Sequence, residues 1–262
     1  MVVELPAERA EVHVKGAHLK GARHIVLKVA TGFYENRARG LPSGDGLFLL
    51  LDAATGVPAL LLEEHGYLTD FRTAAAVALT LKYLAPRGAH EALLVGAGAL
   101  ARLTLWNRTA ERAGQLAREL AQVVETRIAP ALESAVRDAR VIVTATASTT
   151  PLIRDSWVAP GTHVTSVGTG SPEKIELEPA LLARADKLVA DRVCQTERYG
   201  NLHHAVAAGV ATRKRVYAEL GDLAAGRRPG RETPDEITVA DLTGVGVQDA
   251  AIAQAVVEAL GL

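Results

Sequence analysis

Three small residues, Gly96, Gly98 and Ala101, form the pattern G-x-G-x-x-A directly after an apolar run at 92–95. Glycines in such a loop allow a tight turn and a close backbone approach to a pyrophosphate, and the helix that follows offers unpaired N–H groups to the anion. The pattern therefore predicts a dinucleotide site. Because Gly and Ala are abundant in this chain, an ordinary strand-to-helix turn is the alternative interpretation of the pattern alone.

A second apolar run, at 103–106, ends in Asn107, Arg108 and Thr109. In a Rossmann unit the tip of the second strand contacts the adenosine ribose. There, Asp or Glu accepts a hydrogen bond from the 2′-hydroxyl, whereas Arg accommodates a 2′-phosphate. This tip carries Arg108 and no carboxylate, so we expect NADP, with NAD the less favoured cofactor.

The distance between these two motifs along the chain is short. The ribose-contacting residue normally lies about 20 residues beyond the glycines, because a helix crosses back over the sheet. Here only 99–102 separate Gly98 from Leu103, whereas a parallel crossover needs about a dozen residues or more. Either the unit is aberrant, or a segment near 101–102 is missing from the sequence, which is our hypothesis because the surroundings are intact. An intact mass equal to that of the 262 residues would exclude the second explanation.

Hydrophobic patterning predicts the elements that position these motifs. Strands are expected within 1–63, a helix over 68–84 with Thr69 or Asp70 as its N-cap, and a domain boundary at 86–88. Strands and helices then alternate up to about 192, which indicates a parallel sheet covered on both faces. The expected strands are 92–95, 103–106, 141–145, 163–167 and 187–190, and the expected helices are 110–123, 131–139 and 179–185. Residues 193–230 look helical with a polar loop, and the tail predicts a strand at 238–240 and a helix at 249–260.

Composition excludes several classes of function. The net charge is −1, which gives no electrostatic basis for binding nucleic acid or an anionic membrane surface. The single cysteine, Cys194, rules out an intrachain disulfide and is typical of a reducing compartment. No apolar run approaches the roughly 20 residues of a membrane span, and no His, Cys and Asp spacing fits a metal site. We therefore expect a cytoplasmic protein without a metal.

Several segments together resemble the ornithine cyclodeaminase/mu-crystallin family, and they cover almost the whole chain in order. The resemblance implies a homodimer in which a Rossmann NADP-binding domain at 89–239 is joined to an α+β substrate and dimerisation domain. The second domain is formed by 1–88 with 240–262. The segments are IVLKVATGFYENRARGLPSGDG (25–46), LLLDAATG (49–56), YLTDFRTAAA (67–76), VGAGALA (95–101), LWNRT (105–109), VTATAS (143–148), PGTHVTSVG (160–168) and VADLTGVGVQDAA (239–251).

The resemblance also assigns substrate residues. Lys28 occupies the position of the family's substrate-site lysine, and a lysine between apolar residues on a strand needs a partner if it is buried. The alternative for Lys28 is an edge-strand side chain pointing to water. Arg72 matches an arginine of the family's helix motif and suits bidentate capture of a carboxylate. Ser43 and a second basic residue, Lys15 or Arg9, are expected beside the substrate.

Cofactor contacts implied by the resemblance lie in four loops. They are Gly96, Gly98, Ala99, Asn107, Arg108, Thr109, Thr144, Ala145, Thr146, Val167, Gly168, Thr243 and Gly244.

One departure from the family pattern bears on the reaction. True cyclodeaminases carry an acid–base aspartate where this chain has Gly170, and only Glu173 lies near enough to replace it. We therefore expect an NADPH-dependent reductase of a small 2-imino or cyclic imino acid, such as pyrroline- or piperideine-2-carboxylate, or an amino-acid dehydrogenase. The alternatives are a cyclodeaminase-type ammonia lyase that keeps its NAD(P) bound, and a non-catalytic protein that binds NADPH or another small ligand.

Overall fold

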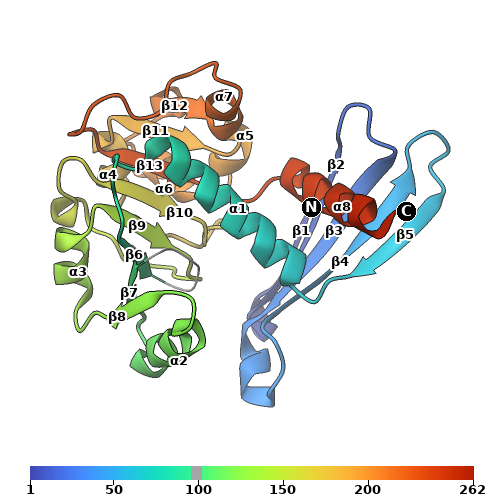
Figure 1. Cartoon of the computed structure of the whole chain (residues 1–262), viewed down its shortest axis with the longest axis horizontal. Coiled ribbons are helices and arrows are strands. Elements are labelled where there is room, and N and C mark those ends of the chain that lie inside the picture. Colours follow the sequence, from blue (N-terminus) through green and yellow to red (C-terminus); the bar gives the residue numbers. More distant parts are fainter. Residues whose placement is uncertain (96–101) are drawn as a thin grey trace. The chain divides into compact units, whose positions relative to one another are not determined.

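The computed structural model describes residues 1–95 and 102–262, apart from the side chain of Arg37. Two compact units make up this part of the chain (Figure 1). Unit 1 is Met1–Ala75 with Val245–Leu262, and unit 2 is Ala76–Gly244. The division falls inside the long helix α1 (Tyr67–Leu84), whereas the sequence suggests a boundary after that helix, at 86–88.

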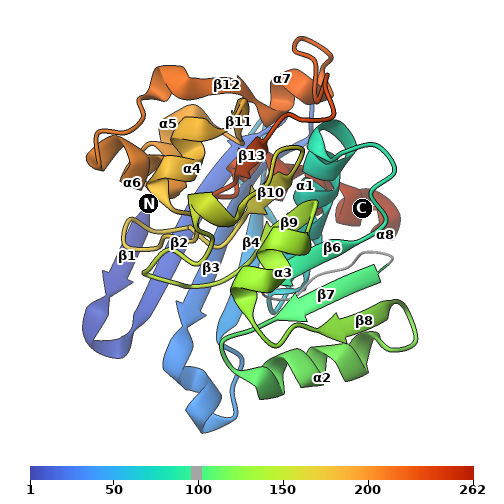
Figure 2. The same cartoon turned by 90° about the vertical axis from the view of Figure 1, so that its left-hand side faces the viewer.

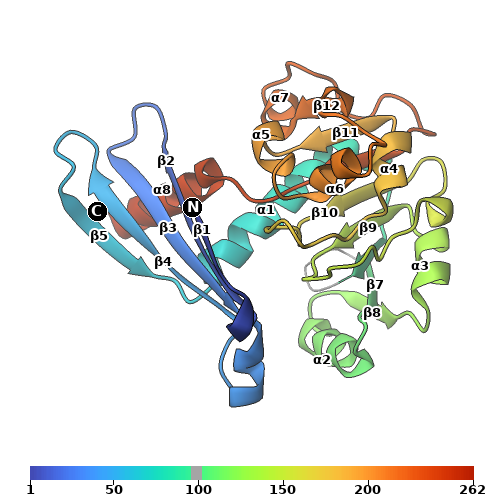
Figure 3. The ribbon, with the colours of Figure 1, turned by 180° about the vertical axis from the view of Figure 1, so that it is seen from behind.

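Unit 1 is an antiparallel sheet with the strand order β1-β2-β3-β4-β5. Helix α8 (Gly246–Leu260) lies on one face of this sheet, as Figures 1 and 3 show. The four strands predicted within 1–63 are confirmed as β2 (Ala10–His18), β3 (His24–Phe33), β4 (Gly44–Asp52) and β5 (Pro58–Glu63). Strand β1 (Val2–Leu5) was not predicted, and the 3-10 turns η1 (Pro6–Glu8) and η2 (Tyr34–Arg39) lie between the strands.

The core of unit 1 forms where alternate strand residues meet one stripe of α8. Val26, Phe48 and Leu50 point to the same face because strand side chains alternate. They pack against Ala250, Ala253 and Val257, which share one side of the helix. This packing fixes which residues of α8 face β3 and β4.

A close backbone approach sets where α8 begins. A Cβ on Gly246 would lie 2.7 Å from the carbonyl oxygen of Gly16 on β2, closer than such atoms come in proteins. Glycine at 246 therefore lets the first turn of α8 lie against the sheet. The side chain of Asp249, three residues later in the same turn, consequently reaches β3.

Unit 2 is a parallel sheet with the strand order β12-β11-β13-β10-β9-β6-β7-β8 (Figure 2). Its strands are β6 (Ala92–Val95), β7 (Arg102–Trp106), β8 (Glu125–Ile128), β9 (Val141–Thr144), β10 (His163–Ser166), β11 (Lys187–Ala190), β12 (Val216–Glu219) and β13 (Thr238–Asp241). Its helices are the second half of α1, α2 (Ala110–Leu120), α3 (Leu132–Asp138), α4 (Pro179–Arg184), α5 (Val193–Thr196), α6 (Asn201–Ala207) and α7 (Leu220–Ala224), with the 3-10 turns η3 (Asp155–Trp157) and η4 (Arg213–Arg215).

Apolar side chains cover both faces of the unit 2 sheet, as the near-continuous apolar strands predict. Leu93 and Val95 pack with the residues of α4 and α6 on one face. Ala92 and Leu94 pack with α2 and the second half of α1 on the other. The α/β class with a Rossmann-type domain and a second domain is thereby confirmed.

The order of strands reverses at β6. Strands β7 and β8 follow on one side of it, and β9 and β10 on the other, which makes the carboxyl ends of β6 and β9 the switch point where such sheets bind ligands. Strands β6 and β7 are parallel neighbours, and the chain between them is 96–101, outside the described residues. The predicted contacts Gly96, Gly98 and Ala99 also lie outside the described residues.

Two sequence predictions of local structure are wrong. Residues 193–230 contain the strand β12 as well as helices, and β8 was not predicted at all. Both strands lie at the edges of the sheet, where short and polar strands are usual and the apolar signal is weak. None of the helices that the structure describes combines the length and apolar character of a membrane span.

The start of α1 also differs from the prediction of a Thr69 or Asp70 cap. The helix begins at Tyr67, and the carboxylate of Glu64 accepts hydrogen bonds from the backbone N–H groups of Leu68 and Thr69 at 2.7 and 3.2 Å. A carboxylate in the preceding turn thus satisfies the first amides of the helix, which Thr69 and Asp70 cannot do from inside it.

Candidate active site

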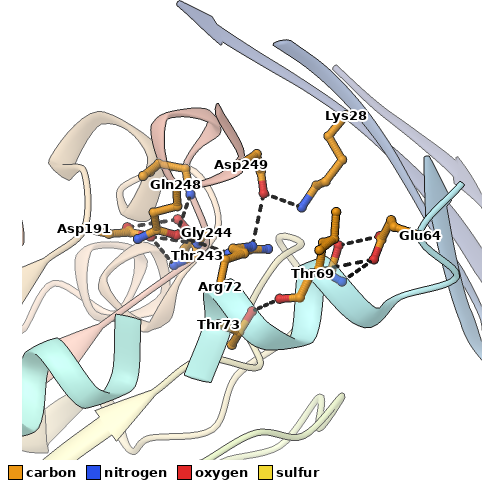
Figure 4. Close-up of polar contacts among 12 residues, drawn as sticks. Lys28, Glu64, Thr69, Arg72, Thr73, Asp191, Thr243, Gly244, Gln248 and Asp249 are labelled. Carbon is orange, nitrogen blue, oxygen red and sulfur yellow. Dashed lines mark hydrogen bonds and ion pairs between the residues drawn. The ribbon is translucent and has the colours of Figure 1, made fainter. Parts of the chain in front are cut away.

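A buried cluster of charged side chains forms in unit 1 between β3, α1 and α8 (Figure 4). Lys28 Nζ donates to Asp249 Oδ1 over 2.8 Å, and both side chains are only 2% exposed. The same oxygen lies 3.1 Å from Arg72 Nε. The two cations predicted from sequence are therefore brought together, and one carboxylate lies between them.

Opposing influences act on the protonation of Lys28. Phe48, directly opposite on β4, holds its ring centroid 6.0 Å from the ammonium nitrogen. Burial, and then the charge of Arg72, lower the pKa of Lys28 from its ordinary value, while the ion pair with Asp249 acts in the opposite direction. A lysine with a lowered pKa loses its proton more readily, so it is suited to exchange protons with a ligand.

The first turn of α1 places Arg72. Glu64 fixes this turn through Leu68 and Thr69, and Arg72 follows one turn later, where its Nη1 donates to Gln248 Oε1 over 3.2 Å. A Cβ on Gly46 would lie 2.6 Å from Glu64 Oε1, so glycine at 46 leaves the space that this carboxylate occupies. The guanidinium is thus held from both α1 and α8.

The other substrate residues expected from sequence are also in unit 1. Lys15 lies directly opposite Lys28 in the pairing of β2 with β3, so their side chains share one face of the sheet. Its alternative, Arg9, is exposed and pairs with Glu35. Ser43 lines an open hollow of about 550 Å³, whose polar lining includes Asp45.

In unit 2, one buried carboxylate holds the loops that follow β9 and β10. Glu176 is fully buried and accepts hydrogen bonds from the backbone N–H groups of Thr146, at 2.6 Å, and Gly168, at 2.9 Å. The hydroxyls of Thr144, Thr146 and Ser166 donate to it at 2.8, 2.8 and 2.6 Å. A Cβ on Gly168 would lie 2.0 Å from the carbonyl oxygen of Thr146. The predicted cofactor loops therefore meet around Glu176.

The neighbouring strands continue this arrangement along the carboxyl edge of the sheet. The backbone N–H of Ala145 donates to Val95 at the end of β6, and that of Val167 donates to Thr144. These bonds link the loops at the switch point to one another.

A second buried carboxylate, Asp191, holds the predicted residues at the end of β13. The backbone N–H groups of Thr243 and Gly244 donate to Asp191 Oδ2 at 2.9 and 2.7 Å. Gln195 on α5 donates to the carbonyl oxygen of Gly244 at 2.7 Å. Gly244 has a φ of 71°, a conformation that favours glycine.

The tip of β7 has the local structure of a tight polar turn. Asn107 Oδ1 accepts a hydrogen bond from the backbone N–H of Thr109 over 2.9 Å, and Arg108 between them is exposed. The turn leads directly into α2. The guanidinium of Arg108 is accordingly presented at the carboxyl end of a strand next to the switch point.

Near Gly170, where cyclodeaminases carry aspartate, the nearest acid is Glu173. Glu173 is exposed and accepts a hydrogen bond from Ser171 over 2.7 Å, a contact within its own turn.

The single cysteine, Cys194, is exposed on α5. His204 contacts the carbonyl oxygen of Lys174, and no group of His, Cys, Asp and Glu suited to a metal occurs among the described residues.

Sequence reasoning missed the carboxylates that hold these sites. Asp249, Glu64, Glu176 and Asp191 were not selected, although Asp249 stands inside a segment that resembles the family. No strong signal marked Asp249, because it stands in the first turn of α8, where acidic residues are common and favour the positive end of the helix dipole.

One further buried acid, Asp241, joins the end of β13 to the start of α6. Its carboxylate accepts hydrogen bonds from the backbone N–H groups of Asn201 and Leu202 at 3.1 and 2.9 Å. Burial raises the pKa of Asp241 to about 6, although these donors favour its charged form.

Unfolding free energy is expected to depend on pH through this group. Its pKa in the folded state lies above the unfolded value of about 3.9. Its stabilising contribution is therefore complete below about pH 4 and is lost as the pH rises through about 6. Between pH 4 and 7 the stability of the wild type should fall relative to Asp241→Asn by up to about 3 kcal/mol. Urea unfolding across this range measures the difference, with the exposed Asp235→Asn as control. A constant difference between the wild type and Asp241→Asn would contradict the expectation.

The order reversal at β6 and the anchored loops at the carboxyl edge define unit 2 as a Rossmann-type dinucleotide-binding domain. The profile of the ornithine cyclodeaminase/mu-crystallin family matches residues 1–261, and the chain belongs to this family. It is an NAD(P)-dependent oxidoreductase, of the imine reductase or dehydrogenase kind.

Three relatives illustrate the similarity. An uncharacterized cyclodeaminase, y4tK, of Sinorhizobium fredii is 41% identical over 96% of this chain and 81% of its own length. The structure of Thermococcus litoralis Delta(1)-pyrroline-2-carboxylate reductase, in complex with NADH and L-proline, is 25% identical with a TM-score of 0.92, covering 100% of this chain and 87% of that one. The iminosuccinate reductase of Paracoccus denitrificans, in complex with NAD+, is 35% identical with a TM-score of 0.84, covering 98% and 84%.

Proposed function

We propose that this protein is an NADPH-dependent reductase of a small 2-imino or cyclic imino acid, of the pyrroline- or piperideine-2-carboxylate type. The observation that carries the proposal is the buried ion pair of Lys28 and Asp249 beside Arg72. Such a cluster offers a carboxylate two cations and offers the reacting nitrogen a titratable ammonium. The similarity to reductases of cyclic imino acids and of iminosuccinate supports the same class of substrate.

In this proposal Arg72 and Lys28 have separate roles. The guanidinium of Arg72 binds the substrate carboxylate, because its planar fork matches two oxygens at once. Lys28, with its lowered pKa, donates a proton toward the imine nitrogen or polarises the C=N bond. Lys15 adds positive charge on the same face of the sheet, and Ser43 lines a hollow together with Thr69 and Asp70 of α1.

The residues at the carboxyl edge of unit 2 suit a nicotinamide dinucleotide, because Gly168 and Gly244 keep the loops free of side chains and buried acids fix their backbones. The bound cofactor supplies the hydride that reduces the C=N carbon. The holding residues would be Asn107, Arg108, Thr109, Thr144, Ala145, Thr146, Val167, Gly168, Thr243 and Gly244, with Gly96, Gly98 and Ala99 from the part of the chain that the structure does not describe.

The preference for NADP rests on Arg108. We expect Arg108→Ala to weaken NADPH binding about 10- to 100-fold, the loss expected for a charge-assisted contact to a phosphate, and to leave NADH binding within about twofold. Titration of cofactor fluorescence measures both dissociation constants. Arg112→Ala, an exposed arginine on α2, is the control. Tighter binding of NADH than of NADPH by the wild type would contradict the preference.

A direct assay tests the proposed reaction. Purified protein with NADPH and each of a set of imines (1-pyrroline-2-carboxylate, 1-piperideine-2-carboxylate and iminosuccinate) should consume NADPH with at least one of them. Incubation with ornithine distinguishes the cyclodeaminase reaction, which would release ammonia and form proline without net cofactor use. Gly170 speaks against that reaction, because glycine has no acid–base group where cyclodeaminases carry aspartate. If no imine is reduced, the reductase proposal is wrong. If NADPH does not bind at millimolar concentration, both the reductase and the cyclodeaminase functions are excluded.

We also propose a homodimer, because one face of the sheet in unit 1 carries partly exposed apolar side chains. Leu27, Leu49 and Leu61 are neighbours in register on the face of the sheet opposite to α8, and Leu61 is 56% exposed. Exposed apolar patches of this kind mark interfaces. A second copy of unit 1 would cover this face, and sedimentation equilibrium measures the state of assembly.

A further inference from the structure

Asp249 uses only one of its two carboxylate oxygens within the protein. Oδ1 accepts the hydrogen bond of Lys28 at 2.8 Å and lies 3.1 Å from Arg72 Nε (Figure 4). Oδ2 is buried, and no group of the described residues donates a hydrogen bond to it. Arg72 Nε, also buried, lies within ion-pair distance of Asp249 but makes no hydrogen bond within the same residues.

Buried polar atoms of this kind are exceptional, because an unsatisfied donor or acceptor loses its hydration without compensation. The two atoms are also complementary in kind: Oδ2 is an acceptor and Nε is a donor. They belong to one cluster, in which Lys28, Arg72 and Asp249 together carry a single net positive charge. A ligand that satisfies both atoms has a carboxylate for the cations and an N–H for Asp249.

We propose that Asp249 binds the nitrogen of the substrate, its Oδ2 accepting the N–H of the iminium or ammonium group, while Arg72 holds the carboxylate and Lys28 keeps the acid–base role given to it above. This inference rests on the proposed function and defines its substrate class as acids whose nitrogen is attached to the carbon next to the carboxylate. The protonated imine accepts a hydride at carbon and becomes a neutral amine, so the carboxylate stabilises the cationic reactant without giving or taking a proton.

The same contact excludes analogues that carry oxygen in place of the substrate nitrogen. A 2-oxo acid or a cyclic ether would direct oxygen lone pairs at Oδ2, so that two acceptors would face each other in a buried site. Sites that offer a buried hydrogen-bonding group reject ligands that leave it unpaired. The cluster therefore selects imino and amino acids over the corresponding keto acids and ethers.

A pair of ligands of the same shape tests this role in the intact protein. L-Proline and (S)-tetrahydrofuran-2-carboxylate differ in having N–H or O at one ring position. Their dissociation constants are measured by calorimetry with saturating NADPH, which cannot react with either. The wild type should bind L-proline at least tenfold more tightly than (S)-tetrahydrofuran-2-carboxylate. Asp249→Asn should lose or reverse this preference, and Glu258→Gln, an exposed acid on the same helix, should retain it.

The outcomes separate this inference from the proposed function. Equal binding of the two ligands by the wild type would overturn the role of Asp249 and leave the reductase proposal standing, as would an unchanged preference in Asp249→Asn. Binding of neither ligand, together with no imine reduction, would overturn the proposed function and this inference with it. The comparison in the wild type needs no variant, so it stands even if Asp249→Asn fails to fold.

Discussion

Replacing Lys28 with methionine is expected to lower kcat/KM for the best imine substrate by about 10²- to 10⁴-fold, the contribution typical of a positioned acid–base group. Methionine has a similar length and suits the apolar surroundings of Phe48, so the change removes the ammonium and little else. Asp249 also lies 3.1 Å from Arg72 Nε, so it is expected to keep an ion-pair partner in the variant. Thermal unfolding and cofactor affinity should therefore stay close to those of the wild type, while steady-state kinetics with NADPH show the loss.

Lys20→Met, which removes an exposed lysine from the turn between β2 and β3, is the matched control and should keep full activity. The lowered pKa of Lys28 adds a pH signature. Because the ammonium deprotonates at a lower pH than an ordinary lysine, the wild-type rate should decline on the alkaline side below the range where free lysine titrates. A Lys28→Met protein with full turnover on every imine that the wild type accepts would remove Lys28 from the mechanism.

Replacing Glu176 with alanine is expected to destabilise unit 2 by about 3–5 kcal/mol, because two buried backbone N–H groups and three hydroxyls lose their acceptor together. Thr146 and Gly168 lose the bonds that hold the loops after β9 and β10. Those loops carry predicted cofactor contacts, so NADPH affinity should fall at least tenfold. Urea unfolding and cofactor titration measure the two effects.

Glu173→Ala is the control for Glu176, since it removes an exposed carboxylate from the same segment and breaks one contact, with Ser171. It should leave stability within about 0.5 kcal/mol of the wild type. If Glu176→Ala unfolds at the same urea concentration as Glu173→Ala, Glu176 does not hold these loops together.

Predictions from the sequence succeeded where the signal was local. The apolar runs at 92–95 and 103–106 became β6 and β7, and the Ala-rich pattern at 68–84 became α1. The edge strands β8 and β12 escaped prediction because they bury little apolar surface and so have no strong pattern. The prediction of Thr69 or Asp70 as the N-cap of α1 was wrong, because Glu64, which accepts the hydrogen bond of the Leu68 N–H, lies before the helix.

The sequence alone determined the family, the α/β class, Arg108 at the tip of the second strand and the pair Lys28 and Arg72, because each rests on residue type and near neighbours. Only the tertiary structure decided what these residues contact. Lys28 and Asp249 are 221 positions apart, and they meet because α8 packs its apolar stripe on the sheet and begins beside Gly16. Glu176 likewise reaches two loops that no spacing in the sequence connects. A buried charge is recognised by the partners that the packing gives it, and those partners follow from the fold as a whole.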